Sequence, residues 1–329
     1  MAQLRNVTLG SPRTAEDGCR RYRPIALTFD ARNTALEQEI GDDWDPDIKE
    51  QWRSNQASIR MGLLGELGTV HGERKIENYM LIGPAPSSII FRHNQMLAQI
   101  RSAFAHGDFY PALLGACGLG ERLLNELLNV LRADYLNHPA TTRRIRNGDV
   151  ITHWGTAVEV LRGWGVLSDG LAANFRDLEA QRHRSVHYNE ALAAAEREPA
   201  LQAVQLVQKI IAGLFTPHGG PPTYIRDTPG ASFFSLQAED VPLVKRVFLP
   251  HSALLSPAHR MYPNTTPSGY EWIIVDNSDY DPTPLTDEQF AAALPAGIAS
   301  MHEDLGWTAE TLRPAQDVHP PQDSSESPA

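Results

Sequence analysis

A short polar stretch near the middle of the chain carries residue types that can cleave phosphodiester bonds. Residues 182–188 read RHRSVHY, with Arg182 and His187 five positions apart. Arginine offers a permanently charged, planar fork to phosphate oxygens, and histidine titrates near neutral pH and can move protons. Both side chains can project toward one point where a helix ends. Arg182 and His187 are therefore candidates for phosphodiester chemistry, and His183, Arg184 and Tyr188 stand beside them in the sequence.

The same stretch also has a purely structural interpretation. Phe175, Leu178 and Val186 fall on apolar positions of an amphipathic helix, which places Arg182 and His187 near its C-terminal end. Cations at that end interact favourably with the helix dipole and with free backbone carbonyls, and they need no catalytic role. Because a lone Arg/His pair is a weak motif, its position among the surrounding elements has to decide between the two interpretations.

Length and composition are those of a globular protein. The chain has 329 residues, of which 42% are hydrophobic, so it has room for one large domain or two ordinary ones. No run approaches the roughly 20 apolar residues of a membrane span, and the first residues lack a secretory core. Two cysteines are too few for a disulfide framework, and Cys117 falls in an apolar helical pattern typical of a core residue. These features predict a cytoplasmic protein without a membrane partner.

The charge balance is acidic, with a formal net charge of −11, which argues against a surface coated for non-specific nucleic-acid binding. Seven of the 40 acidic residues are clustered in residues 37–50. Arginines gather closer to the polar stretch, at positions 132, 143, 144 and 146. They are consistent either with a small basic pocket or with an ordinary solvated surface.

Helical periodicity dominates residues 87–215. The spacing of apolar residues predicts helices over about 87–106, 109–135, 150–164, 168–186 and 199–215, and Gly107 suits the end of the first. The apolar face of the second helix is wide enough to be buried on more than one side. Its glycines, at positions 115, 118 and 120, indicate close helix packing. Short connections between such helices favour an antiparallel bundle.

The regions that flank the predicted bundle differ from it in composition and in predicted secondary structure. We predict an N-terminal extension with one helix over residues 1–86, the helical bundle over 87–216, a small α+β domain over 217–313 and a disordered tail over 314–329. Within the small domain, the pattern predicts strands at 232–236, 244–249 and 270–275, followed by a helix capped by Thr286. The predicted fold class is mainly α.

Two features of the middle region resemble the HEPN superfamily, named for its occurrence in higher eukaryotes and prokaryotes. Residues 109–126 read FYPALLGACGLGERLLNE, similar to the family's long helix with an aromatic start, small residues in the middle and an acid before leucines. Arg182 through His187 fits the family pattern of an Arg, a polar residue, and a His four to six positions after the Arg. The stretch lies between the fourth helix and the final one, where the family places it. The resemblance covers roughly residues 87–215 and implies an antiparallel HEPN-like bundle.

The resemblance implies a metal-independent endoribonuclease that needs no cofactor and acts as a homodimer. In the family, two Arg/His motifs face each other across the subunit interface and form one composite site. His183 stands where the family often has Asn. Tyr188 follows His187 immediately, so it departs from the Arg-x4-His-x-Tyr pattern of the subgroup whose tyrosine is modified. The resemblance implies that Arg182 and His187 are the catalytic residues, with His183, Arg184 and Tyr188 as candidate phosphate contacts. The implied partners are RNA and a second copy of the chain, with room for an antitoxin or regulatory partner, and the implied role is that of a toxin or anti-phage defence effector.

A rival interpretation retains the helical bundle but assigns it no catalytic activity. A non-catalytic HEPN module would serve as a dimerisation or RNA-binding scaffold. The intact Arg182/His187 pair favours the enzyme, and the acidic net charge favours the scaffold. The two hypotheses differ in whether RNA is cut.

Overall fold

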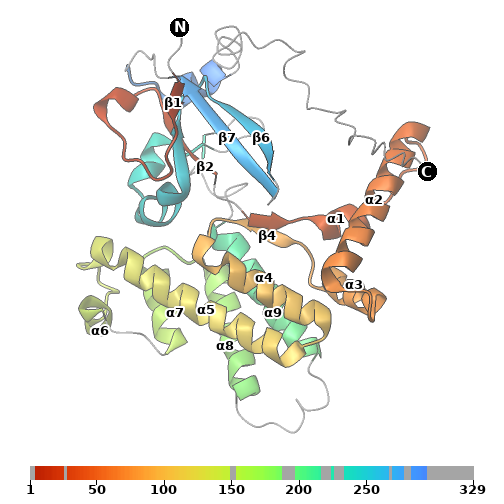
Figure 1. The fold of residues 1–329 in the computed structure, drawn as a ribbon. Helices are drawn as coiled ribbons and strands as arrows, with labels where there is room; N and C mark the ends of the chain where they lie inside the picture. The colour runs from red at the N-terminus through yellow and green to blue at the C-terminus, as the bar shows by residue number, and fades with distance from the viewer. Residues whose placement is uncertain are drawn as a thin grey trace, which may run out of the picture. The chain divides into compact units, whose positions relative to one another are not determined.

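The chain folds into two compact units, each drawn from more than one part of the sequence (Figure 1). The computed structural model describes residues 4–25, 28–148, 153–186, 197–215, 224–225, 233–266, 269–277 and 283–294. The helical unit is drawn from residues 24–224 and 232–252, and the sheet unit from residues 1–23, 225–231 and 253–329. The architecture is mainly α-helical with small antiparallel sheets, which confirms the predicted mainly α class at this level.

The helical unit contains most of the predicted helices close to their predicted bounds. Within the described residues its α-helices are α1 (Arg32–Glu37), α2 (Pro46–Leu67), α3 (Gly72–Leu81), α4 (Phe91–His106), α5 (Phe109–Leu131), α6 (Arg143–Asn147), α7 (Trp154–Gly163), α8 (Asp169–Val186) and α9 (Arg197–Phe215). Gly107 ends α4 with a positive φ of 92°, as its position predicted. The basic run predicted near residue 143 lies on α6, which exposes Arg143, Arg144 and Arg146 to solvent.

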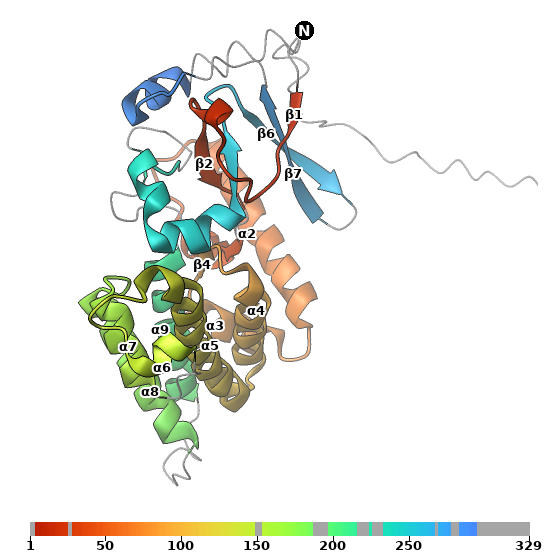
Figure 2. The same ribbon diagram turned by 90° about the vertical axis from the view of Figure 1, so that its left-hand side faces the viewer.

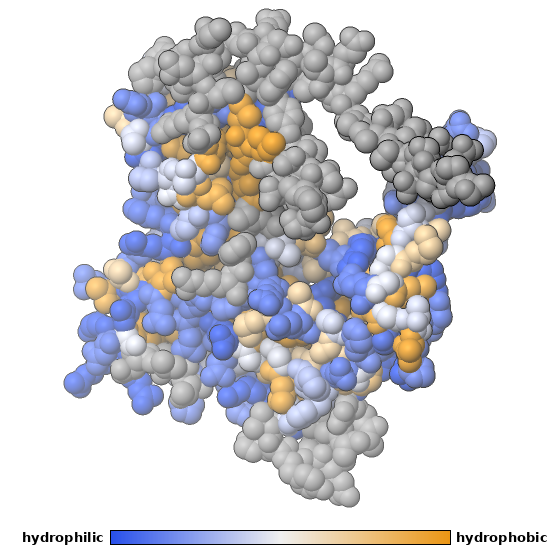
Figure 3. Space-filling model, viewed as in Figure 1, coloured by the Kyte–Doolittle hydropathy of each residue, from blue (hydrophilic) through white to orange (hydrophobic). Residues whose placement is uncertain are grey.

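Helix α5 forms the centre of the helical unit. It packs against α4, α7, α8 and α9, and both ribbon views show it among these helices (Figures 1 and 2). A Cβ on Gly120 would lie 2.6 Å from Leu178 and 2.9 Å from Trp154, and one on Gly115 would lie 2.8 Å from Ile100. Close helix packing is therefore confirmed for these two glycines. On the face shown in Figure 3, hydrophilic side chains cover most of the helical unit.

The region before the bundle differs from the prediction of one helix, because it contains α1, α2 and α3. The predicted helix is α2, which ends at Gly68 with a φ of 79°. A short two-stranded antiparallel sheet, β3 (Thr28–Asp30) with β4 (Ala85–Ser88), precedes α4. Asp30 accepts hydrogen bonds from Arg32 at 3.0 and 2.9 Å and from the Tyr79 hydroxyl at 2.8 Å. This cluster ties β3 and α1 to α3.

The predicted strand at 244–249 is wrong. Residues Val244–Phe248 form the π-helical segment η5, followed by the 3₁₀ turn η6 (Leu249–His251) and preceded by the 3₁₀ turn η4 (Leu236–Asp240). Val244 and Phe248 are both buried, four positions apart on one helical face. The predicted strand at 232–236 is likewise reduced to an isolated bridge between Tyr224 and Phe234. Short apolar runs fit either structure, and here packing on the helices decides.

The sheet unit is built from both ends of the chain. Its three-stranded antiparallel sheet has the order β1-β7-β6, from β1 (Leu4–Asn6), β7 (Gly269–Asn277) and β6 (Arg260–Thr266). Leu4 pairs with Asn277, and Arg260 pairs with Val275. The second sheet pairs β2 (Arg21–Pro24) with β5 (Ser252–Leu255), and η1 (Ala15–Asp17) precedes β2. The strand predicted at 270–275 is confirmed as part of β7.

Buried charges hold the sheet unit together. The Arg20 side chain, 2% exposed, contacts Asp17 and lies 3.2 Å from Asp276 Oδ2. Ser256 Oγ donates to Asp276 Oδ1 at 2.6 Å. Arg21 is fully buried and donates to Asp287 at 2.9 Å, at the start of a helix over residues 287–294. These pairs tie the N-terminal strands to the C-terminal segments.

Thr286 caps the helix over 287–294, as predicted. Its hydroxyl accepts from the Gln289 backbone N–H at 3.2 Å, and the Gln289 side chain accepts from the Thr286 N–H at 2.8 Å. The predicted linker at 217–222 and the predicted tail at 314–329 lie outside the described residues.

Candidate functional site

Arg182 lies on α8, one helical turn beyond the fully buried Leu178. This spacing places its side chain at the edge of the core rather than on the open face of the helix. Its guanidinium Nη2 is 3.2 Å from Oε2 of Glu121 on α5, and the two side chains are 35% and 31% exposed. A partly exposed cation is thus held in place by a neighbouring helix while about a third of its side chain faces solvent.

The polar contacts continue from Arg182 toward α9. Ser185 Oγ donates to the Arg182 carbonyl at 2.9 Å. Gln181 is buried and donates to Gln202 Oε1 at 2.9 Å, and Gln202 donates in turn to Glu198 at 2.8 Å. The end of α8 is therefore fixed to both α5 and α9, which limits how far Arg182 can move.

Cys117 lies close to the same edge. It is 2% exposed, and its Sγ is 3.9 Å from the Leu178 carbonyl oxygen. Burial raises the pKa of the Cys117 thiol to about 12, although the Arg182 charge opposes the rise. The thiol stays protonated at neutral pH, so Cys117 is a core residue, as its apolar helical pattern predicted.

The remaining predicted site residues do not converge on Arg182 in the described part of the chain. The His183 side chain is 61% exposed and lies 3.9 Å from Glu179, one turn back on α8. Arg184 is exposed and its Nε donates to the Ala180 carbonyl at 3.4 Å. His187 and Tyr188 lie outside the described residues, which reach Val186 on this helix. The Arg182–His187 geometry stays a prediction.

Glu121 is a site residue that the motif alone did not single out. Its signal in the sequence was the acidic residue before leucines in the stretch 109–126, which resembles the long helix of the HEPN superfamily. The structure adds that this carboxylate is the partner of Arg182. A carboxylate there can orient the guanidinium fork and leave its outer edge available to a phosphate.

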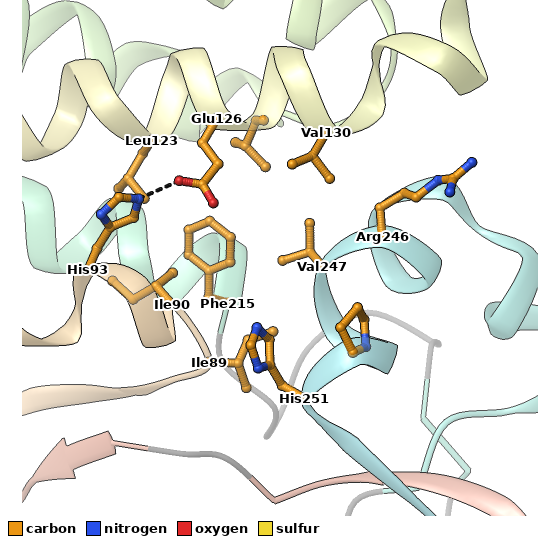
Figure 4. A pocket seen from close by; sticks show the side chains of 12 residues that line it. Ile89, Ile90, His93, Leu123, Glu126, Val130, Phe215, Arg246, Val247 and His251 are labelled. Carbon is orange, nitrogen blue, oxygen red and sulfur yellow. Dashed lines mark hydrogen bonds and ion pairs between the residues drawn. The ribbon is translucent and has the colours of Figure 1, made fainter. Parts of the chain in front are cut away.

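A second feature, a cavity of about 300 Å³ in the helical unit, was not predicted (Figure 4). It contains a histidine–carboxylate pair, with His93 Nε2 and Glu126 Oε2 2.5 Å apart. Nothing in the sequence pattern joined these two residues, because they are on different helices and 33 positions apart.

Two further findings concern metals and membranes. Within the described ranges, no group of three or more His, Cys, Asp or Glu side chains is arranged to hold a metal ion. The helices that the structure describes include none with the length and apolar character required to cross a bilayer. The RNA and homodimer predictions rest on the sequence.

Comparisons with known proteins add no relative. No protein-family model matches the chain, and neither the curated proteins nor the solved structures give a match.

Proposed function

We propose that the chain is a metal-independent endoribonuclease of the HEPN type, acting as a homodimer in a toxin or anti-phage defence role. The observation that carries this proposal is the Arg182–Glu121 pair, which holds a partly exposed arginine side chain near the end of α8, five residues before His187. The pair also joins the two sequence features on which the family resemblance rests.

The chemistry is transfer of a phosphodiester within RNA. His187 removes the proton from the 2′-hydroxyl, whose oxygen attacks phosphorus as the bond to the 5′-oxygen breaks. The leaving oxygen takes a proton from His187 of the partner subunit, giving a 2′,3′-cyclic phosphate and a 5′-hydroxyl. Arg182 stabilises the charge that builds on the phosphate oxygens. Proton transfer by a positioned histidine contributes on the order of 10²–10⁴-fold.

One specific observation favours the scaffold alternative. The Arg182–Glu121 pair links α8 to α5, which is a structural role that needs no substrate. The formal charge of −11 also disfavours broad affinity for RNA. A scaffold would bind a second copy of the chain, or RNA, without cutting.

Matched RNA and 2′-O-methyl RNA oligonucleotides separate the two functions, because methylation blocks the attacking hydroxyl but leaves the phosphates intact. The enzyme is expected to bind both and to cut only the RNA, leaving cyclic phosphate ends in the presence of EDTA. Binding of both without cleavage would favour the scaffold. Cleavage of the methylated strand would contradict the proposed mechanism.

A further inference from the structure

A group of arginines covers the solvent side of α6. Arg143, Arg144 and Arg146 are all exposed, whereas Ile145 between them is only 2% exposed. Successive residues on a helix are about 100° apart, so the inward position of Ile145 directs the three arginines toward solvent. Figure 1 shows α6 at the outer edge of the helical unit, where a large partner can reach it.

Arg132 joins this group from the 3₁₀ turn η2 (Arg132–Tyr135). Its guanidinium lies against Gly148, the residue that ends α6, where an added Cβ would meet Arg132 Nη1 at 1.8 Å. Arg146 Nε donates to the Leu136 carbonyl at 3.4 Å, which ties α6 to the end of η2. The four arginines at 132, 143, 144 and 146 therefore form one surface, the α6 arginine cluster.

The α6 arginine cluster lacks the acidic partners that other surface arginines have. Among the residues that the structure describes, none of its four arginines is paired with a carboxylate. Exposed arginines elsewhere on the helical unit do pair with acids: Arg60 with Glu73, Arg162 with Asp169 and Arg176 with Glu159. With 40 acidic and 29 basic residues in the chain, composition alone would favour such pairing at α6 as well.

The acid within residues 132–148 does not neutralise the cluster. It is Asp134, whose two carboxylate oxygens accept from Nε and Nη2 of Arg246 at 2.9 and 3.1 Å. Arg246 thereby offsets this acid and leaves the arginines of α6 with their positive charge. The cluster is thus a local excess of positive charge on an acidic protein, and such a patch attracts an anionic partner.

The backbone beneath the arginines is held by the core. Tyr135 stacks on Trp164, with ring centroids 4.7 Å apart and planes 8° apart. Trp164 Nε1 donates to Thr141 Oγ1 at 3.0 Å, and Thr141 Oγ1 donates to the Tyr135 carbonyl at 2.5 Å. Thr142 then caps α6 by accepting from the Ile145 N–H at 3.4 Å. A scaffold that is already ordered lowers the entropy cost of binding a partner.

The chemistry of this surface fits a chain of phosphates. Each guanidinium offers parallel donors that match two phosphate oxygens. The exposed residues beside the arginines on α6 are Thr142 and Asn147, both polar. The centre of a protein–protein interface is instead rich in aromatic and other large apolar anchors.

We propose that the α6 arginine cluster is a docking surface for the phosphate backbone of RNA, an inference that rests on the proposed ribonuclease function. The cluster holds the strand on the helical unit and supplies no catalytic group. Because its contacts go to phosphates, it adds affinity without sequence preference.

Binding of a fluorescein-labelled 2′-O-methyl RNA to the full chain tests the docking surface, because this strand keeps its phosphates and resists the proposed cleavage. Fluorescence anisotropy at low and at physiological salt measures the affinity. Combining Arg143→Gln, Arg144→Gln and Arg146→Gln should weaken binding at least about tenfold at low salt. It should also reduce the slope of log affinity against log salt by about 2, because three phosphate contacts are lost.

The matched control combines Arg53→Gln, Arg60→Gln and Arg74→Gln, which remove the same charge from exposed positions on α2 and α3. It should bind the RNA within about twofold of the wild type, because salt screens charges outside the contact. Circular dichroism checks that each variant is folded. Arg144→Glu alone should weaken binding at least about threefold and keeps the test open if the triple variant at α6 does not fold.

Equal weakening by the two triple variants would overturn the docking surface, because net charge would then explain the binding. No binding of the RNA by the wild type at low salt would also overturn it. Polyglutamate that binds as tightly as the RNA would do the same and would indicate an acidic protein partner. Cleavage of unmodified RNA tests the ribonuclease separately, and binding through the cluster without cleavage would support the docking surface while contradicting the ribonuclease.

Discussion

At the scale of single residues, the proposed ribonuclease site depends on how Glu121 holds Arg182. Their side chains are each about a third exposed, so the pair is screened by water and contributes no more than about 1 kcal/mol to stability. Its geometric effect can be much larger, because a guanidinium that swings away from the phosphate no longer stabilises the transition state. Activity and stability should therefore respond differently when the pair is broken.

We expect Glu121→Gln to lower the rate of RNA cleavage about tenfold, with a melting temperature close to that of the wild type. Arg182→Lys should lower the same cleavage rate about 10²-fold, because lysine keeps the charge but lacks the planar fork. Initial cleavage rates and thermal melts measure both quantities. Glu179→Gln, beside His183 on the same helix, is the control and should leave the rate within about twofold. A loss of activity in Glu121→Gln that parallels a loss of stability would argue for a structural pair only.

His259 in the sheet unit gives a pH-dependent prediction. It is 4% exposed, its Nδ1 is 2.7 Å from the Ser256 carbonyl oxygen, and its Nε2 is 3.0 Å from Arg23 Nη1. Because arginine only donates, Nε2 accepts and the ring is neutral. Burial lowers the pKa of His259 to about 4, with the Arg23 charge adding to the effect.

The unfolded chain takes up this proton near pH 6.5, whereas the folded chain resists it until about pH 4. The stabilisation by the neutral ring is thus complete above pH 6.5 and is lost as the pH falls toward 4. Between pH 6.5 and 5 we expect a loss of about 2 kcal/mol in the free energy of unfolding, measured by urea denaturation. His259→Gln should remove that slope. An unchanged slope in the variant would assign it to other groups.

At the scale of elements, α5 shows which features of the sequence determine packing. Its glycines look alike in the sequence, but a Cβ on Gly120 would clash with Leu178 and Trp154, whereas one on Gly118 meets nothing within 4 Å. The sequence indicated close packing for the whole group and could not rank its members. That ranking depends on which neighbouring helix approaches each position.

The two glycines make a matched pair of variants. Gly120→Ala should destabilise the protein by about 1–3 kcal/mol through overpacking. Gly118→Ala should instead stabilise it by about 0.5–1 kcal/mol, because alanine is the better helix former. Chemical denaturation of both variants measures the difference. If both change stability in the same direction, the described contacts between α5, α7 and α8 are incorrect.

The η5 segment illustrates where local pattern fails. Val244, Val247 and Phe248 satisfy the spacing of a helix face as well as the apolar content of a strand. The run is only five residues long and has no strand partner in the described structure, so packing in the helical unit decides its conformation. Its contribution to the cavity around Glu126 was unpredictable for the same reason.

At the scale of the whole molecule, the long helices were predictable and the assembly of the units was not. Helices such as α5 and α9 carry enough apolar repeats to be recognised from local periodicity. The pairing of β1 with β7 joins residues more than 260 positions apart, which no local pattern encodes. The predicted division followed the chain in order, whereas each compact unit combines distant segments.

The candidate site was likewise predictable only in part. Arg182 could be selected from its residue type and its place near a helix end, but its partner Glu121 lies 61 positions earlier on a different helix. The cavity residues His93 and Glu126 share neither a motif nor a helix. Long-range pairs of this kind require the packing of α4, α5 and α8 to be known.

The most direct test of the central claim is RNA cleavage by the wild type and by His187→Ala in EDTA, with folding confirmed for both. His153→Ala, at an exposed position before α7, serves as the matched histidine control. We predict that the wild type and His153→Ala cut RNA and that His187→Ala loses at least about 10²-fold of that rate. Equal cleavage by all three proteins, or no cleavage by the wild type, would contradict a metal-independent ribonuclease centred on Arg182 and His187.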